Sequence, residues 1–192
     1  MSTESEAESR ETSTPVLPPR RVGTLVIAAV LVLALDQISK ALVVANLEHH
    51  PPLRLLGGAV YFTVIRNSGA AFSLATGMTW VFTLVAIAVA VGIAWVAPRL
   101  RSVGWAIGLG FVLAGALGNL TDRIFRSPGP LRGAVVDFIS LFSPNGAHFA
   151  IFNFADSGIT VGGALIVLMV VLGRDYDGQR IHGRRGGKSE RG

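Results

Sequence analysis

The chain has 192 residues and a mass of 20.2 kDa, with 51% hydrophobic residues, 15% charged residues and a mean hydropathy of +0.54. Only thirteen charged residues fall between positions 22 and 172, whereas the first 21 residues hold seven and the last 20 hold nine. A soluble surface would carry charge on about a quarter to a third of its residues, so this composition excludes a soluble domain and indicates a membrane protein. The net charge of +5 does not indicate nucleic-acid binding, because basic segments beside apolar spans are typical of contact with anionic lipid.

Four apolar stretches approach the length that a helix needs to cross about 30 Å of hydrocarbon. They are Val22–Val44, Met78–Ala97, Val103–Leu120 and Asp156–Leu172. Three Lys or Arg residues precede the first stretch, two lie between the second and the third, and six follow the fourth. Because cytoplasmic segments carry the excess of Lys and Arg, we expect a four-helix membrane bundle with both termini in the cytoplasm and with loops 45–77 and 121–154 outside.

The domain organisation follows from these spans. We expect a disordered cytoplasmic tail over 1–21, a membrane domain over 22–172 and a basic cytoplasmic tail over 173–192. The first span is not read as a cleaved signal peptide, because it exceeds the usual apolar core, contains Asp36 and Lys40, and precedes three further spans. Small residues at four-residue spacing, such as Gly158 and Gly162, allow close helix approach.

The outer loops carry signals for a small β-element. Leu53–Leu56 and Ala59–Ile65 are short apolar or β-branched runs on either side of two glycines, which predicts a hairpin. A third run, Gly133–Ile139, lies in the second outer loop. We therefore expect an extracytoplasmic sheet on the outer face of the membrane.

Polar residues from three spans fall at nearly the same depth. At a rise of 1.5 Å per residue, Asp36 lies about 21 Å from the cytoplasmic end of its span, and Asn119 and Asp156 each lie about 24 Å from theirs. Ionisable groups in a bilayer cost about 2.5–3.5 kcal/mol each on insertion scales and by default mark function. Their agreement in depth predicts a polar site close to the outer boundary.

Helical spacing groups these residues further. Three sets share a helix face: Asp36 with Lys40, Asn119 with Asp122 and Arg123, and Asn153 with Asp156. Asp36 and Lys40 could equally be a pure packing ion pair, and Asn153 a plain helix cap. For Asp137 and Asp156, both at the outer rim beside apolar runs, the functional interpretation is favoured.

Most hydrolytic chemistries lack the residues that they need. The absence of cysteine excludes a thiol nucleophile, and none of the four histidines stands in a zinc-type pair, so we expect neither a metal nor a cofactor. Ser68 and Ser157 have no obvious base and no G-x-S-x-G context. Paired carboxylates remain, and two aspartates that share one proton can activate a water for peptide hydrolysis.

Five motifs then match one family. They are Asp36-Gln37-Ile38-Ser39-Lys40, Asn67-Ser68-Gly69-Ala70-Ala71-Phe72, Gly118-Asn119-Leu120-Thr121-Asp122-Arg123, Val135-Val136-Asp137-Phe138 and Phe152-Asn153-Phe154-Ala155-Asp156. With these motifs, in this order on a four-span frame, the chain resembles the lipoprotein signal peptidases (type II signal peptidases), which are bacterial membrane aspartic endopeptidases.

The resemblance implies a role for each matched residue. Asp137 and Asp156 match the catalytic aspartates of the family. The polar residues that line its site match Asn67, Asn119, Arg123 and Asn153, while Asp36 and Lys40 support the site nearby. Asp122 matches no catalytic position and is interpreted as structural.

The resemblance also implies the substrate and the location. The family removes the signal peptide of a prolipoprotein just before a cysteine that carries diacylglyceryl, so the expected partners are such prolipoproteins and membrane lipids, not nucleic acid. We expect a monomer in the bacterial cell membrane, with its active site near the outer leaflet. The segment Phe125–Arg132 looks longer than the family's usual link, which predicts an enlarged outer loop without loss of activity, and the tails look dispensable.

Two other classes of membrane protein fit the sequence less well. A small transporter or channel subunit should continue its polar residues toward the cytoplasmic side, whereas the inner halves of all four spans are almost wholly apolar. A structural membrane scaffold does not explain two aspartates on opposite flanks of one outer loop. The sequence therefore favours a membrane peptidase.

Overall fold

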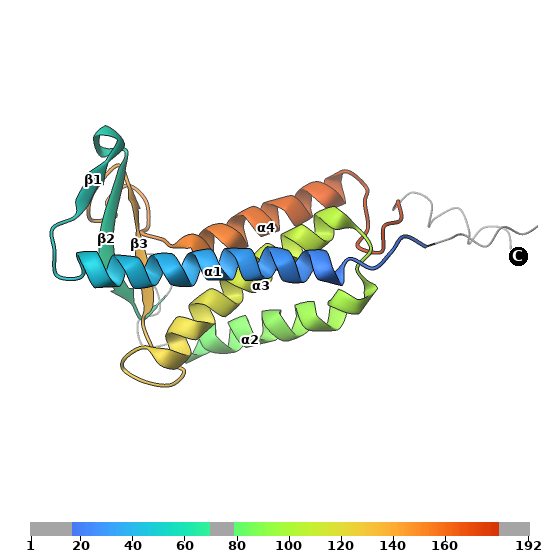
Figure 1. Ribbon diagram of the computed structural model, residues 1–192, viewed down its shortest axis with the longest axis horizontal. Helices are drawn as coiled ribbons and strands as arrows, with labels where there is room; N and C mark the ends of the chain where they lie inside the picture. Colours follow the sequence, from blue (N-terminus) through green and yellow to red (C-terminus); the bar gives the residue numbers. More distant parts are fainter. Residues whose placement is uncertain (1–16, 70–78, 181–192) are drawn as a thin grey trace, which may run out of the picture.

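The computed structural model describes residues 17–69 and 79–180, and its four long helices lie alongside one another (Figure 1). The helices are α1 (Val22–Leu47), α2 (Thr79–Val96), α3 (Val103–Phe125) and α4 (Phe154–Val171). All four are long and apolar enough to cross a membrane, which confirms the predicted bundle. Met78, with which the second span was predicted to begin, lies outside the described residues, as do most of both tails.

Two helices extend beyond the ends expected from apolarity. α1 continues from Val44 to Leu47, and α3 continues from Leu120 to Phe125. The extension of α3 carries Asp122 and Arg123, whose side chains are buried against neighbouring elements. Charged residues can prolong a membrane helix where they face the protein interior, so the apolar run underestimated its length.

α3 is the central helix of the bundle and packs against the other three. Glycines make its contact with α4 close. A Cβ on Gly162 would lie 2.5 Å from the carbonyl oxygen of Gly108, and one on Gly115 would lie 2.3 Å from the carbonyl oxygen of Ala155. These contacts fix the position of α4, and with it the residues in its first turn.

A three-stranded antiparallel sheet lies across one end of the bundle (Figure 1). Its strands, in spatial order, are β1 (Leu53–Leu55), β2 (Val60–Asn67) and β3 (Val135–Leu141). β1 and β2 form the predicted hairpin, and the run predicted in the second outer loop supplies β3. Val136 and Phe138 of β3 pack with Val43 of α1, so the sheet is attached to the bundle by an apolar core.

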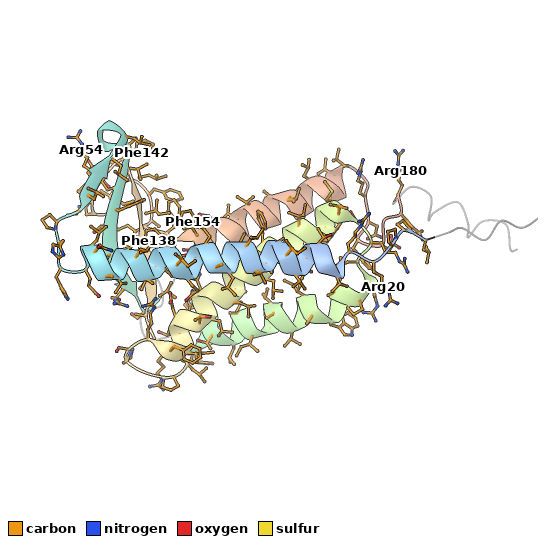
Figure 2. All side chains as sticks on the ribbon, in the orientation of Figure 1. Arg20, Arg54, Phe138, Phe142, Phe154 and Arg180 are labelled. Atoms are coloured by element: carbon orange, nitrogen blue, oxygen red, sulfur yellow. The ribbon has the colours of Figure 1, made fainter. Side chains whose placement is uncertain are left out.

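The described ends of the chain meet at the opposite end of the bundle. Arg20 and Arg180 lie at this end in Figure 2, and Arg54 and Phe142 lie on the sheet at the other. The link between α2 and α3 includes a short 3-10 turn, Ala97–Arg99. Backbone hydrogen bonds join this link to the segments before α1 and after α4.

Candidate active site

Asp137 and Asp156 come from elements that the fold brings together. Asp137 lies in β3 opposite Ile65 of β2 and is only 3% exposed, while Asp156 lies in the first turn of α4 and is partly buried. The sheet fixes the first aspartate and the start of a helix fixes the second.

Asn153 joins the two aspartates. Its Nδ2 donates to Asp137 Oδ1 at 2.7 Å. It is also the N-cap of α4, because its Oδ1 accepts from the backbone N–H of Asp156 while Asp156 Oδ2 accepts from the N–H of Asn153. This reciprocal capping box fixes the rotamer of Asp156. Asn153 is therefore both a helix cap and a bridge to Asp137, so the two interpretations of it do not compete.

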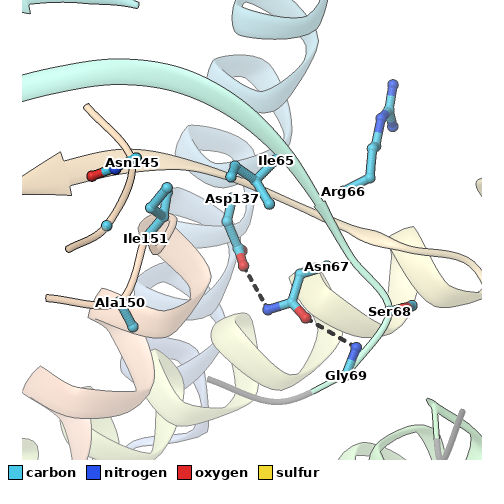
Figure 3. Close-up of a pocket in the computed structure, with 10 residues that line it drawn as sticks. Ile65, Arg66, Asn67, Ser68, Gly69, Asp137, Asn145, Ala150 and Ile151 are labelled. Carbon is cyan, nitrogen blue, oxygen red and sulfur yellow. Dashed lines mark hydrogen bonds between the residues drawn. The ribbon is translucent and has the colours of Figure 1, made fainter. Parts of the chain in front are cut away.

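Two further asparagines donate to the carboxylate oxygen of each aspartate that Asn153 does not bond. Asn119 Nδ2 donates to Asp156 Oδ1 at 2.8 Å, and its Oδ1 accepts from Asn153 Nδ2 at 3.2 Å. Asn67 Nδ2 donates to Asp137 Oδ2 at 2.8 Å, and its Oδ1 accepts from the N–H of Gly69 (Figure 3). Each carboxylate is thus oriented by amide donors, which accept no proton themselves.

The surroundings of Asp137 change its acidity. Burial raises the pKa of Asp137, and the nearby charge of Asp156 raises it further, to about 7. Hydrogen bonds from Asn67 and Asn153, together with the charge of Lys40, oppose this rise but do not cancel it. Asp137 therefore exchanges its proton near neutral pH, which suits general acid–base chemistry.

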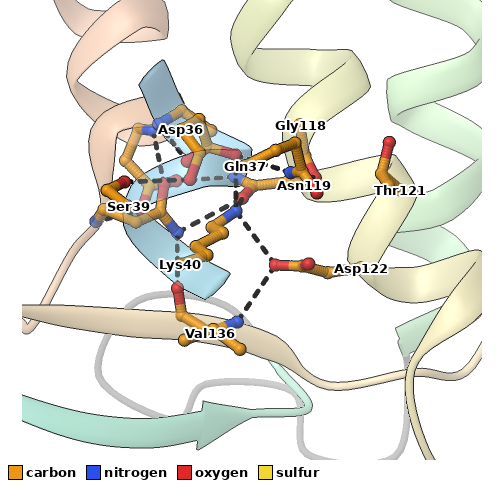
Figure 4. Close-up of polar contacts among 12 residues, drawn as sticks. Asp36, Gln37, Ser39, Lys40, Gly118, Asn119, Thr121, Asp122 and Val136 are labelled. Carbon is orange, nitrogen blue, oxygen red and sulfur yellow. Dashed lines mark hydrogen bonds and ion pairs between the residues drawn. The ribbon is translucent and has the colours of Figure 1, made fainter. Parts of the chain in front are cut away.

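Lys40 lies next to Asn119 and is fully buried (Figure 4). Its Nζ contacts Asp36 Oδ2 and Asp122 Oδ2 at 2.9 Å each, and donates to Asn119 Oδ1 at 3.1 Å. Because an ammonium group only donates, it fixes Asn119 with its oxygen toward Lys40 and its Nδ2 toward Asp156. The predicted Asp36–Lys40 pair is confirmed, and it also orients the site.

Asp36 and Asp122 connect this buried lysine to the backbone on both sides. Asp36 Oδ1 accepts from the N–H of Ala155 in the first turn of α4, at 2.9 Å. Asp122 Oδ2 accepts from the N–H of Val136, the residue before Asp137, at 3.1 Å. The network thus reaches the main chain beside both aspartates of the site.

Arg123 is the remaining polar residue of the predicted site. It is buried, its Nη1 donates to the carbonyl of Asn119, and its guanidinium lies over the ring of Phe82 at 5.8 Å. Within residues 17–69 and 79–180, its Nε has no hydrogen-bond partner.

The aspartates face a cavity of about 620 Å³ between the sheet, α3, the segment before α4 and the N-terminal half of α4. Its polar wall contains both aspartates with Asn67, Asn119 and Arg123, and its apolar wall contains Leu141, Phe149, Ile151, Ile159 and Val161. A second, smaller cavity of about 200 Å³ also reaches Asp137 and is lined by Arg66, Ser68 and Asn145 among others (Figure 3). Asp137 lines both cavities.

The structure brings all eight predicted site residues into one connected region. Asp36 does not line the cavity and contacts the site through Lys40 and the N–H of Ala155. Residues 70–72 of the second motif lie outside the described residues. Sequence reasoning missed the contact of Asp122 with Lys40 and Val136, although the spacing of Asp122 from Asn119 indicated a shared face. The apolar wall, including Phe149 and Ile151, had no signal in the sequence.

Comparisons with known proteins identify the family of the chain. Residues 28–172 match the family model described as signal peptidase (SPase) II. The lipoprotein signal peptidase of Mycobacterium tuberculosis (strain ATCC 25618 / H37Rv) is 48% identical over 176 residues, which cover 92% of this chain and 84% of that protein. That of Rhodococcus jostii (strain RHA1) is 50% identical over 166 residues, which cover 86% of this chain and 81% of that protein.

Solved structures show the same architecture. A bacterial membrane enzyme determined by the in meso method at 1.9 Å resolution superposes with a TM-score of 0.67 at 28% sequence identity, and the match covers 81% of this chain and 97% of that one. A second, at 2.3 Å resolution, gives a TM-score of 0.68 at 27% identity and covers 81% and 92%. The chain therefore belongs to the signal peptidase II family of membrane proteases.

Proposed function

We propose that this protein is an aspartic endopeptidase that removes the signal peptide of bacterial prolipoproteins by cleaving before a diacylglyceryl-modified cysteine. The observation that carries the proposal is the pair Asp137 and Asp156, bridged by Asn153 at the polar wall of a largely apolar cavity. Family membership supports the activity and the prolipoprotein substrate.

The pair has the features that water activation needs. With the pKa of Asp137 near 7, one carboxyl can keep a proton at neutral pH while its neighbour is ionised. The ionised group takes a proton from water as the water oxygen attacks the scissile carbonyl carbon, and the protonated group gives its proton to the carbonyl oxygen. The resulting tetrahedral diol collapses as the protonated carboxyl gives its proton to the leaving amine nitrogen and the ionised carboxyl takes the proton of one diol hydroxyl, so the C–N bond breaks and the pair again holds one proton. No bond to the enzyme forms.

Neighbouring side chains would hold the substrate. The guanidinium of Arg123 and the amides of Asn67 and Asn119 line the cavity and offer donors to backbone carbonyls of an extended peptide. Removing one such donor costs a buried partner its hydrogen bond, about 1–3 kcal/mol.

The apolar wall suits the lipid of the substrate. Ile159 and Val161 line the cavity and are 40% and 52% exposed on the face of a membrane-spanning helix. Acyl chains that lie along this wall would anchor the modified cysteine beside the aspartates. The smaller cavity, with Arg66 and Asn145, would then receive the first residues of the mature protein.

The proposed setting is the bacterial cell membrane, with both termini in the cytoplasm and the sheet and site at the outer leaflet. The distribution of arginines supports this orientation, since the end opposite the sheet carries the link between α2 and α3 and both described chain ends. We further propose that the monomer is the active unit, because every site residue named above comes from one chain.

The test is a cleavage assay with the purified full-length protein in detergent. One prolipoprotein is supplied in two forms, with and without diacylglyceryl on its cysteine, and products are identified by mass spectrometry. We expect cleavage just before the modified cysteine and at least about a hundredfold slower turnover of the unmodified form, because acyl burial contributes about 0.8 kcal/mol per CH₂.

Two results would contradict the proposal. Equal turnover of both forms would mean that the apolar wall does not bind the lipid of the substrate. Cleavage at another bond would mean that the modified cysteine does not set the position of the scissile bond. A chelator should leave the rate unchanged, and inhibition that added metal reverses would replace the aspartic mechanism with a metal-dependent one.

A further inference from the structure

A third cavity of about 810 Å³ lies at the end of the bundle opposite the sheet, between α2 and α3. Its walls are apolar and aromatic, with Trp95 from α2 and Trp105 and Val112 from α3. Among the described residues that line it, Arg99 carries the one charged side chain. None of these residues takes part in the proposed peptidase site, so this groove needs its own explanation.

The mouth of the groove is fixed by aromatic contacts. Trp105 Nε1 donates to the carbonyl of Arg174 at 2.8 Å, and its ring meets Tyr176 edge-on with centroids 6.3 Å apart. Arg99 lies over the ring of Trp95 at 4.5 Å and donates to the carbonyl of that residue. The charged group is thereby held at the rim, while the walls below it stay apolar.

The length of the groove matches one leaflet. Along α2 and the 3-10 turn that follows it, the lining runs from Val89 to Arg99, ten residues or about 15 Å at the α-helical rise. Half of the 30 Å hydrocarbon core is also about 15 Å. A packed partner helix would run along all of α2, whereas an acyl chain with its head group at Arg99 would end near Val89. Gly92, where an added Cβ would meet nothing within 4 Å, leaves the groove open to such a chain.

The charge around the rim selects the head group. Segments 17–21, 97–102 and 173–180 meet at this end and together contain six arginines and two aspartates. A basic surface at the depth of the lipid phosphates attracts anionic lipid, by about fivefold in affinity for each Lys or Arg near the surface.

We propose that this groove is a binding site for one anionic phospholipid, with an acyl chain between α2 and α3 and its phosphate at Arg99. The site lies at the end of the bundle remote from the aspartates, and it stands whether or not the peptidase mechanism is correct. Its occupant would fill the space that the one-sided packing of α2 on α3 leaves open.

Tryptophan quenching by brominated lipids tests this site directly. The chain has three tryptophans, and Trp80 is the one outside the groove, at the other end of α2. Trp80→Phe therefore leaves only the two groove tryptophans. This variant is reconstituted in phosphatidylcholine vesicles, and dibromo-phosphatidylglycerol or dibromo-phosphatidylcholine is added in increasing mole fraction. We expect half-maximal quenching at a mole fraction about fivefold lower for the anionic lipid.

Three substitutions in the same background separate the causes. Arg99→Gln should weaken the preference for the anionic lipid, because the arginine nearest the acyl groove is removed while the others at this end remain. Gly92→Leu should reduce quenching by both lipids, because its side chain fills the groove. Gly23→Leu is the matched control, since a Cβ there also meets nothing within 4 Å and Gly23 lies on α1, outside the groove.

Equal quenching by the two lipids would overturn the proposal, as would a Gly92→Leu protein that behaves like its parent. Light scattering tests the alternative occupant, a second copy of the chain. A dimer that Gly92→Leu dissociates would assign the groove to protein contact and contradict the lipid site.

Discussion

Asp137 has the most informative environment of any single residue in this protein. Burial and the charge of Asp156 raise its pKa to about 7, and the bond from Asn67 Nδ2 to its Oδ2 holds the pKa below the value it would otherwise reach. If the mechanism needs one proton on the pair, activity falls as pH rises above about 7, where Asp137 ionises.

Removal of Asn67 should therefore move this alkaline limb. In Asn67→Ala the ionised form of Asp137 loses a donor, so its pKa rises and the limb of kcat against pH shifts upward by up to about one unit. The control is Asn46→Ala, because Asn46 is exposed on α1 and its Nδ2 donates to the carbonyl of Leu42 in the same helix. An alkaline limb that stays in place or moves to lower pH contradicts the assignment.

The same pKa makes a prediction about stability. The pKa of Asp137 is about 7 in the folded chain and near 3.8 in the unfolded one, so the folded state binds more protons between these values. Stability therefore falls as pH rises through this interval, and the loss is complete above pH 7.

Asp137→Asn cannot ionise and should escape this loss. We expect its melting temperature in detergent to fall less between pH 5 and pH 8 than that of the wild type. Parallel curves for the two proteins would mean that the pKa of Asp137 is not raised by folding, which would contradict the assignment. The measurement also verifies that the variant is folded before its activity is compared.

The sequence alone identified the aspartates but only part of their support. Asp137 and Asp156 could be predicted because an ionisable group at a membrane boundary is expensive and needs a reason. The contact of Lys40 with Asp122 could not, because it joins residues far apart in the chain and requires α3 to continue beyond its apolar run. The double role of Asn153 depends on where β3 places Asp137.

At the scale of the elements, the contact between α3 and α4 sets the position of Asp156. A Cβ on Gly115 would lie 2.3 Å from the carbonyl oxygen of Ala155 and 2.5 Å from Ile159 Cγ1, so Gly115→Ala must push the helices apart. Overpacking of this kind costs about 1–3 kcal/mol. We expect a lower melting temperature and reduced turnover, because Asp156 follows Ala155 directly.

The matched control is Gly163→Ala on α4, where an added Cβ meets nothing within 4 Å. It should leave both melting temperature and turnover close to wild type, since alanine also favours a helix more than glycine does. If the two alanine variants behave alike, the close approach of α3 to α4 does not govern the site.

The elements themselves were largely predictable, and their assembly was not. Hydrophobic length predicted the four helices, and Gly57 and Gly58 between two β-prone runs predicted the hairpin. The pairing of β3 with β2 joins residues about 70 positions apart, such as Asn67 and Val135, and no local pattern encodes it. Loop closure over such a distance is decided by packing of the sheet on α1.

At the scale of the whole molecule, the proposed orientation places the reaction at the outer face of the membrane. The absence of cysteine from the chain allows this to be tested with single introduced thiols. Leu56, 80% exposed in the turn between β1 and β2, and Pro98, in the turn between α2 and α3, mark the two ends of the bundle.

In intact spheroplasts, a membrane-impermeant maleimide should label Leu56→Cys and not Pro98→Cys, and both should react after lysis. Labelling of Pro98→Cys alone in intact spheroplasts would invert the topology and place the aspartates at the cytoplasmic face. Labelling of neither before lysis would mean that the sheet is not accessible from outside.

The central claim is that Asp137 and Asp156 together hydrolyse the prolipoprotein, and turnover of a diacylglyceryl-modified prolipoprotein by single Asp→Asn variants tests it most directly. Loss of a general acid or base costs about 10²–10⁴-fold, so Asp137→Asn and Asp156→Asn should each fall by at least about a hundredfold. Asp177→Asn, at the opposite end of the bundle, should retain wild-type turnover. Full activity in either of the first two variants, with the protein folded, would contradict the account.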